Sequence, residues 1–566
     1  MRIRAGWRYG GRRAPFGPCH PGDDNWGCAE VQSHWPFALC ACRASKAGDE
    51  GGVPAALLVS PAGLSENSRI PLPGLGPHNR LMCRLAKSLR SVMHPCWSVW
   101  VLAGWLGVLV HGAEVVTNAP PIGPSAGPAV PNIIFILADD LGYGDLGCYG
   151  QTRIKTPNLD RLAAGGMRFT QCYAGSCVSA PSRAALMTGL HSGHGWIRGD
   201  GEASLRPRDF TVAELLKQAG YKTGAIGKWA LGPSGTPGTP EQKGFDQWAG
   251  FLDARHAQDY YPEFIWRCDS ARGATGKFPL VMNQGGQRRL YIQDLFSNAA
   301  ANFIRLNKPD RFNQFTPFFL YLAVTLPHAN NELTRRTRNG MDTPTDAPYS
   351  KENWPQPEKN KAAMITRLDS DVGRILDQLE QLKLATNTVV FFSSDNGPHA
   401  EGGNDPAFFG SAGPFRGGKR SLHEGGLRVP LLVRWPGRIQ AGATNDHPCA
   451  LWDFLPTAAE LAGRTVPKDI DGRSLLPALL GKEPSRHPYL YWEFHEGGFQ
   501  QALRLGDWKA VRPAEALPLQ LFDLKRDPGE QTDVAGSHPD VVGKVEKLLR
   551  EARTESPLWP VKGKSE

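Results

Sequence analysis

Two apolar runs limit the fold of this chain more than any other feature. Residues 132–138 (NIIFILA) and 388–394 (TVVFFSS) are nearly continuous and rich in β-branched and aromatic side chains, as is typical of strands buried on both faces. Segments with helical spacing, such as 211–220 and 361–382, alternate with runs of this kind. This order predicts an α/β fold with a doubly wound, mostly parallel sheet flanked by helices.

The character of the sequence changes near residue 486. Three short segments with alternating apolar residues follow, PYLYWEF, QALRLGDWKAVR and LQLFDLKRD, and a helical pattern covers about 538–553. We therefore predict a main domain over 131–485 and a smaller C-terminal antiparallel α+β subdomain over 486–566.

Residues 1–113, called the leader here, carry most of the net charge of +9. Residues 1–113 hold 12 Lys and Arg against 6 Asp and Glu, whereas the remainder holds 52 against 49. The body is thus nearly neutral, and no nucleic-acid partner is expected. Residues 1–81 are rich in Gly, Pro and Arg without a sustained period, so we interpret them as unstructured or as lying upstream of the true start.

Residues 82–113 have the anatomy of a signal peptide. Three basic residues are followed by an apolar run from Trp97 to Val110 and then by small residues. The run is short for a membrane span, so an uncleaved anchor is the alternative and the only membrane contact we expect. Residues 114–130 are interpreted as a linker, and the body as exported, either periplasmic or secreted.

Four oxygen-bearing side chains follow the two apolar runs. Asp139 and Asp140 come after the first run, and Asp395 and Asn396 after the second. Ligands of parallel sheets bind beyond the carboxyl ends of the strands. Carboxylates and an amide, with no Cys or His among them, suit a hard cation. One Asp alone is often a helix cap, but two such pairs after two similar strands favour a metal site.

Three cations occur at comparable points of the chain. Lys228 follows a strand pattern, Lys419 lies in GGKRSLHEGG, and Arg183 lies one helical turn beyond Ser179. Together with a divalent metal, these cations would form a dense positive site for a tetrahedral oxyanion ester. Ser179 at a helix start adds the positive end of the helix dipole.

The segment SAPSRAALMTG, residues 179–189, resembles the sulfatase signature C/S-x-P-S-R-x-x-x-x-T-G. The match places Ser179 at the position that sulfatases oxidise to formylglycine, and it leaves Cys177 outside the pattern. The resemblance spans most of residues 131–535 and includes ILADDLGYGDLGCYG, GKWALG, PHANNE, SSDNG, GGKRSLHEGGLRVP and GDWKAVR. The chain is most similar to the bacterial arylsulfatase A-like branch, which implies an alkaline-phosphatase-like fold.

The resemblance implies a sulfuric ester hydrolase that releases inorganic sulfate from aryl or carbohydrate sulfate esters. It implies a Ca²⁺ site, with Mg²⁺ as the alternative ion, whose ligands are Asp139, Asp140, Asp395, Asn396 and the modified Ser179.

The remaining polar residues have implied roles around the sulfate. Arg183 and Lys228 would orient the formylglycine hydrate, and Lys228, His328 and Lys419 would hold the sulfate, with His328 near the leaving oxygen. One hydroxyl of the hydrate would attack sulfur and expel the alcohol. Deprotonation of the second hydroxyl would then re-form the aldehyde and release sulfate.

The chain departs from the family pattern at two positions. Ser at position 179 is similar to sulfatases matured by an iron–sulfur radical enzyme, a transient partner that implies a bacterial source. The common K-W-H is Lys228–Trp229–Ala230 here, so the His that often accepts the proton of the hydrate is missing. His256 in ARHAQDYYPEF is one substitute, and a loop-capping or substrate-contacting role for it is equally open.

Two other functions stay open on the sequence. A phosphodiesterase or phosphonate monoester hydrolase of the same superfamily would share the core motifs, since phosphate and sulfate esters share a shape. An inactive protein that binds sulfated glycans is the second alternative, because it would not need the His that is missing at Ala230. The S-x-P-S-R context favours sulfate, and the complete metal and cation set favours an enzyme. Segments 191–208, 234–290 and 331–358 would build subsites for a sulfated sugar or small molecule.

Overall fold

The computed structural model describes residues 130–201, 203–269 and 274–561. The sequence interpretations of residues 1–81, 82–113 and 114–129 lie outside the described residues. Within the described ranges, no helix combines the length and the apolar character needed to cross a membrane.

The main sheet has eleven strands in the described residues, ordered β10-β2-β9-β8-β1-β7-β3-β4-β5-β6, with β11 paired to β2. The strands are β1 Asn132–Ala138, β2 Met167–Tyr173, β3 Lys222–Lys228, β4 Gln247–Phe251, β5 Phe264–Asp269, β6 Ala274–Pro279, β7 Phe318–Ala323, β8 Thr388–Ser394, β9 Arg428–Arg434, β10 Ala443–Asn445 and β11 Cys449–Ala450. The five central strands β8, β1, β7, β3 and β4 run parallel. Strand β9 runs antiparallel to both β8 and β2, and β5 and β6 form an antiparallel hairpin at the other edge, so the sheet is mixed.

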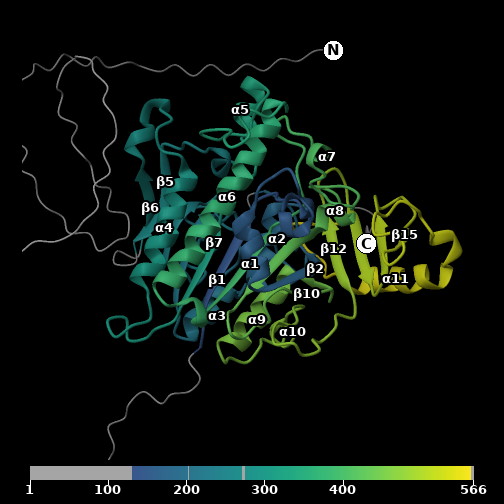
Figure 1. Cartoon of the computed structure of the whole chain (residues 1–566). Coiled ribbons are helices and arrows are strands. Elements are labelled where there is room, and N and C mark those ends of the chain that lie inside the picture. Colours follow the sequence, from purple (N-terminus) through teal and green to yellow (C-terminus); the bar gives the residue numbers. More distant parts are fainter. Residues whose placement is uncertain (1–129, 202, 270–273, 562–566) are drawn as a thin grey trace, which may run out of the picture. The chain divides into compact units, whose positions relative to one another are not determined.

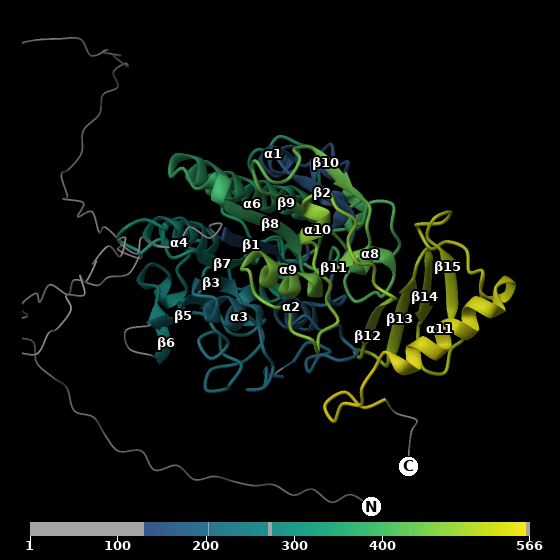
Figure 2. The same ribbon diagram turned by 90° about the horizontal axis from the view of Figure 1, so that it is seen from below.

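Helices cover both faces of this sheet (Figures 1 and 2). The α-helices of the main domain in the described residues are α1 Pro157–Ala164, α2 Ser179–Thr188, α3 Val212–Gln218, α4 Ile292–Leu306, α5 Asn331–Thr337, α6 Gln356–Gln381, α7 Pro406–Phe409, α8 Glu424–Leu427, α9 Phe454–Leu461 and α10 Leu476–Leu479. Alternate residues of β1 explain the two layers: Ile134 and Ile136 pack in one core with α1, α4 and α6, and Ile133 and Phe135 in the other with α2, α3 and α9. The continuous apolar run thus reflects burial on both faces. The predicted mixed, mostly parallel sheet with flanking helices is confirmed.

A second, four-stranded antiparallel sheet forms the C-terminal part, which confirms that prediction. Its elements are β12 Leu490–Phe494, β13 Gln500–Leu505, β14 Trp508–Arg512, β15 Gln520–Asp523 and the helix α11 Pro539–Glu551. One face of this sheet packs on α11, with Tyr491 and Leu503 against Leu549. On the other face, Trp492 packs in one cluster with Cys177 and Val178, the two residues before α2.

Trp492 anchors the second sheet to the segment that leads into α2. Its ring is fully buried and its Nε1 donates a hydrogen bond to the carbonyl of Ala174 at 2.9 Å. Trp492→Ala should lower the free energy of unfolding by about 3–5 kcal/mol, because it leaves a large cavity and an unpaired carbonyl. Urea unfolding measures this loss.

Leu517 supplies the control for the Trp492 prediction. Its side chain is 52% exposed, so Leu517→Ala should change stability by no more than about 0.5 kcal/mol. Equal losses in the two variants would show that Trp492 does not anchor the second sheet.

Candidate active site

The two oxygen-rich pairs meet at the carboxyl ends of β1 and β8. These strands pair in parallel with Ala138 opposite Ser394, so the residues that follow them emerge side by side. The amide of Asp140 donates a hydrogen bond to Asp395 Oδ1 at 3.1 Å, which joins the two strand ends. Asp140 also has a φ of 64°, an uncommon conformation for a residue other than glycine and one that often marks a functional site.

The four side chains fit a hard divalent cation. All of them are buried, with exposed fractions of 1% or less. Asn396 Nδ2 donates to Asp140 Oδ1 at 2.7 Å, while Asn396 Oδ1 is buried without a hydrogen-bond partner. A buried acceptor without a donor is costly, and a cation beside the carboxylates would satisfy it. The donor set contains only oxygens, which is the chemistry that Ca²⁺ and Mg²⁺ prefer.

Ser179 lies beside this group as the first residue of α2. The helix begins at Ser179 itself. The Ser179 hydroxyl donates to Asp139 Oδ1 at 3.1 Å and accepts a hydrogen bond from Lys228 Nζ at 3.1 Å. A nucleophile derived from this side chain would therefore lie between a carboxylate and an ammonium group.

Lys228 and Arg183 bridge the carboxylates from two different elements. Lys228, the last residue of β3, places Nζ 2.8 Å from Asp139 Oδ2. Arg183, in α2, donates to Asp395 Oδ2 from Nε at 2.9 Å and from Nη2 at 2.7 Å. The Arg183 Nη1 also donates to the carbonyl of Lys228 at 2.9 Å, so the two cations hold each other in place.

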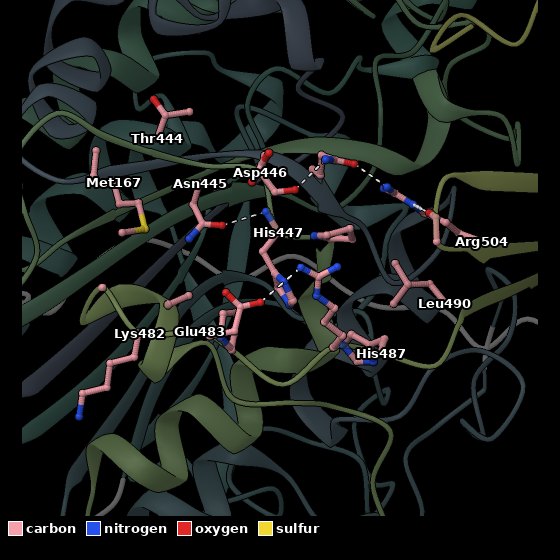
Figure 3. Close-up of a pocket in the computed structure, with 18 of the residues that line it drawn as sticks. Met167, Thr444, Asn445, Asp446, His447, Lys482, Glu483, His487, Leu490 and Arg504 are labelled. Carbon is pink, nitrogen blue, oxygen red and sulfur yellow. Dashed lines mark hydrogen bonds and ion pairs between the residues drawn. The ribbon is translucent and has the colours of Figure 1, made fainter. Parts of the chain in front are cut away.

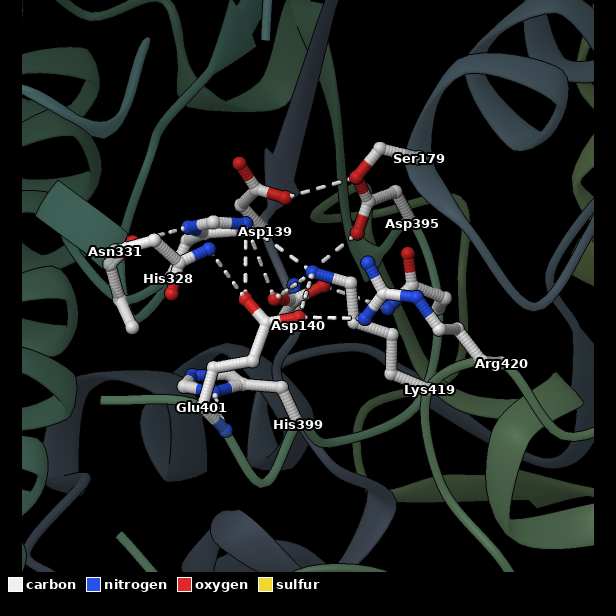
Figure 4. Close-up of polar contacts among 12 residues, drawn as sticks. Asp139, Asp140, Ser179, His328, Asn331, Asp395, His399, Glu401, Lys419 and Arg420 are labelled. Carbon is white, nitrogen blue, oxygen red and sulfur yellow. Dashed lines mark hydrogen bonds and ion pairs between the residues drawn. The ribbon is translucent and has the colours of Figure 1, made fainter. Parts of the chain in front are cut away.

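Lys419 and His328 complete the site beside Asp140 and Glu401 (Figure 4). Lys419 Nζ donates to Asp140 Oδ2 at 2.8 Å and lies 3.1 Å from His328 Nε2. His328 Nδ1 lies 2.7 Å from the carbonyl of Ala329, which can only accept, so this hydrogen bond assigns the proton to Nδ1. His328 Nε2 is then the atom that faces the carboxylates, 3.5 Å from Asp140 Oδ2.

Neighbouring cations keep the buried carboxylates charged. Burial alone would raise the pKa of Asp139, but Lys228, His328 and Arg183 outweigh it and lower the pKa to about 2. Burial likewise opposes ionisation of Asp140, whereas Lys419 and two histidines lower its pKa to about 2. The site is therefore a dense, alternating set of fixed charges in a water-poor setting.

Sequence reasoning missed four residues around Lys419. Glu401 lies 3.4 Å from Lys419 Nζ, accepts a hydrogen bond from Asn331 Nδ2 at 2.9 Å, and forms an ion pair with Arg420. His399 is buried beside them, and this burial lowers its pKa to about 4. Asn331 and Arg420 lie within the quoted motifs PHANNE and GGKRSLHEGGLRVP, so the motifs themselves were a signal that could have found these two residues.

His256 lies apart from these contacts. It is in a short 3-10 helix, His256–Gln258, after β4, and its ring packs 4.7 Å from the ring of Phe251 and 4.4 Å from that of Phe264. Its described side-chain contacts include neither Ser179 nor Lys228, and burial lowers its pKa. A proton-accepting role for His256 stays a prediction. Ala230, where the family often has His, keeps a φ of 59°, a conformation in which His is enriched over Ala.

A second group of ligand-type side chains is internally satisfied. His191, His194 and Asp471 place one ligand atom each within 4.8 Å of one another. His191 Nδ1 accepts the backbone N–H of Gly193 at 3.1 Å, so Nε2 carries the proton and faces Asp471 Oδ1 at 3.5 Å. A protonated nitrogen cannot bind a metal, so this cluster is a hydrogen-bonded support for the loop after α2.

A cavity of about 590 Å³ lies beside β10 and contains none of the site residues described above (Figure 3). Its walls mix cations such as Lys482 and Arg486 with anions such as Glu483 and Asp446. Arg486 and Glu483 pair with each other at 3.3 Å. The balanced charge gives this cavity no preference for the anionic esters discussed here.

Fold and site together define a hydrolase of the alkaline-phosphatase-like architecture that acts on oxyanion esters. The sulfatase family model matches residues 131–464, and the model for the C-terminal part of N-sulphoglucosamine sulphohydrolase matches residues 413–555. The chain belongs to the sulfatase family and is a sulfuric ester hydrolase.

Similar proteins include enzymes that act on sulfated sugars. The chain is 31% identical to the N-acetylgalactosamine-6-O-sulfatase of Bacteroides thetaiotaomicron over 75% of this chain and 93% of that one. The solved structure of Ps i-CgsB in complex with k-i-k-neocarrahexaose is similar with a TM-score of 0.63 and 30% identity, covering 76% of this chain and 95% of that one. The phosphonate monoester hydrolase of Agrobacterium radiobacter, with a TM-score of 0.54 and 23% identity over 74% of this chain and 95% of that one, shares the fold.

Neutral, buried His191 predicts a loss of stability in mild acid. Burial outweighs the attraction of Asp471 and lowers the pKa of His191 to about 4, whereas an unfolded His titrates near 6.5. As the pH falls from about 6.5 to 4, the unfolded chain binds a proton that the folded chain does not, so the free energy of unfolding decreases. His191→Asn keeps an acceptor near Gly193 and should make this decrease smaller. Urea unfolding at pH 7 and at pH 4.5 measures it; an unchanged decrease would exclude His191 as a contributor.

Proposed function

We propose that this chain hydrolyses carbohydrate sulfate esters, with Ser179 oxidised to formylglycine and a divalent cation bound beside it. The observation that carries this proposal is the placement of the Ser179 hydroxyl 3.1 Å from both Asp139 Oδ1 and Lys228 Nζ. Unmodified Ser is a weak nucleophile, and no neutral base contacts Ser179 among the described residues. Attack by an unmodified Ser would also leave a sulfated Ser, which is a stable ester. Turnover through unmodified Ser179 would therefore stop at that ester.

The cation would be held by Asp139, Asp140, Asp395 and Asn396, with the modified Ser179 as a further ligand. We propose Ca²⁺, with Mg²⁺ as the alternative, because every donor is an oxygen. When bound, such an ion neutralises the carboxylates and polarises the oxygens of the sulfate. The buried Asn396 Oδ1, which has no partner in the protein, supports this ligand set.

The remaining residues bind the ester and manage its charge. Formylglycine, once hydrated, would supply a hydroxyl that displaces the alcohol at sulfur. It would also supply a second hydroxyl whose deprotonation re-forms the aldehyde and releases sulfate. Lys228 and Arg183 orient that group, because both reach the carboxylates on which it would rest. Lys419 and His328 hold the sulfate. His328 Nε2 is the ring nitrogen that faces the site. In the imidazolium form of the ring it would carry the proton that the leaving oxygen needs.

Maturation and export are part of the proposal. Ser rather than Cys at position 179 favours an iron–sulfur radical maturase as a transient partner. Ser179 is 2% exposed in the folded chain, so we propose that the maturase acts before α2 is packed. The basic and apolar pattern of residues 82–113 supports export to the periplasm or the medium, and N-terminal sequencing of the exported form tests it.

The substrate class is proposed from the similar enzymes named above. A 6-O-sulfated N-acetylgalactosamine is the first candidate, and a panel of sulfated sugars together with 4-nitrophenyl sulfate tests the choice. Faster turnover of a sugar sulfate than of the aryl sulfate supports a carbohydrate substrate. Turnover of the aryl sulfate alone would contradict it.

Replacing Ser179 should abolish turnover. Ser179→Ala removes the precursor of formylglycine, so kcat should fall by about 10⁴-fold or more. In active wild-type protein, the peptide that contains Ser179 should be lighter by about 2 Da, since oxidation of the side chain removes two hydrogens. Mass spectrometry and turnover of a sulfate ester are measured on the same sample.

Cys177 provides the matched control for Ser179. Its thiol is fully buried two residues away, and burial raises its pKa, so it is unreactive in the folded chain. Cys177→Ala should leave kcat within about twofold, on the general expectation for residues that do not touch reacting atoms. Full activity of wild-type protein that mass spectrometry shows to be unmodified would contradict the formylglycine proposal.

Removing the metal should also stop the reaction. Chelation should abolish turnover and added Ca²⁺ should restore it. Asn396→Ala removes the ligand oxygen that has no other partner, so this variant should need about tenfold or more Ca²⁺ for half-maximal activity. Wild-type activity that survives exhaustive chelation, with metal content confirmed to be absent, would contradict the metal proposal.

A further inference from the structure

Two buried cysteines face each other across neighbouring strands of the main sheet. Strand β11 pairs in parallel with β2, and Cys449 is the direct register partner of Cys172. Side chains of directly paired residues point to the same face of a sheet. Both cysteines are fully buried and belong to the same core cluster, the one that contains α2 and α9.

Both cysteines are free thiols in this structure. We propose that Cys172 and Cys449 are joined by a disulfide bond when the chain folds under oxidising conditions. Paired residues of neighbouring strands lie about 4.7–4.9 Å apart, within the range of about 4.4–6.8 Å between the Cα atoms of a disulfide. The Cβ atoms of facing residues are typically about 4.5–5.5 Å apart and a disulfide needs about 3.5–4.5 Å. Strand β11 is only two residues long, so a small shift of its backbone can bring the Cβ atom of Cys449 closer to that of Cys172. The two thiols are close enough for Cys172 to raise the pKa of Cys449.

The reaction requires an external oxidant, for which a small disulfide such as oxidised glutathione suffices. A thiolate of one cysteine attacks the small disulfide and releases one small thiol. The second cysteine then attacks the mixed disulfide, which releases the second small thiol and closes the Cys172–Cys449 bond. Two electrons and two protons pass from the protein to the oxidant. Burial raises the pKa of Cys449 in the folded chain, so little reactive thiolate is present there. The bond would therefore form during folding, before the two cysteines are buried.

The bond would stabilise the two segments that hold α2, the helix that begins at Ser179, in place. Strand β2 leads directly into the segment that ends at Ser179, and β11 leads into the short 3-10 helix Leu451–Asp453, against which α2 packs. The cross-link would join these two supports and close a loop of more than half of the described chain. Long loops of this kind give the largest expected loss of entropy in the unfolded chain.

The test compares refolding with and without the oxidant. Denatured, reduced protein is refolded in oxidised and reduced glutathione or in dithiothreitol, then alkylated under denaturing, non-reducing conditions and digested. The oxidised sample should yield a cross-linked peptide pair that contains Cys172 and Cys449, about 2 Da lighter than the sum of the two thiol peptides. Its thermal midpoint should exceed that of the reduced sample by about 5 °C or more.

Matched variants separate this bond from general effects of oxidation. Cys172→Ala and Cys449→Ala should each abolish the difference in thermal midpoint between the two samples, and Cys148→Ala, which removes a half-buried thiol elsewhere, should retain it. Complete alkylation of both cysteines after oxidative refolding of the wild-type chain would overturn the proposal, as would a cross-link from either one to Cys177. Neither measurement depends on sulfatase activity.

Discussion

The attraction between buried carboxylates and the cations around them is the interaction on which the site depends. Parallel pairing of β1 and β8 brings Asp139, Asp140 and Asp395 together where water is scarce. Such a group of like charges is costly unless opposite charges are close. Lys228 and Lys419 supply part of that compensation, and each comes from a different segment of the chain. The charges therefore constrain how β3, α2 and the segment before α8 are placed.

The second sheet contributes to the same site without supplying any of its proposed ligands. It packs Trp492 against Cys177 and Val178, so it supports the segment that leads into α2. The backbone of Cys177 also accepts a hydrogen bond from the amide of Arg420, the residue after Lys419. Packing of the C-terminal part and placement of the cations are thus linked through one short segment.

Features with a strong local signal could be predicted from the sequence. The apolar runs of β1 and β8 and the polar residues that follow them sufficed for the parallel core and for the position of Asp139 and Asp395. The antiparallel hairpin β5–β6 was missed, because its mixed residues in Phe264–Pro279 show no clear alternation. Glu401 was missed for another reason: its role depends on neighbours such as Asn331 that only the tertiary fold brings close.

The central proposal is that this site hydrolyses sulfate esters in preference to phosphate esters of the same shape. The most direct test is the ratio of kcat/KM for N-acetylgalactosamine 6-sulfate to that for N-acetylgalactosamine 6-phosphate, measured with matured protein saturated with Ca²⁺. A sulfatase site should give a ratio well above one, of about 10² or more, which corresponds to a difference in transition-state stabilisation of about 3 kcal/mol. A ratio below one would contradict it and would favour a phosphoryl hydrolase on the same fold.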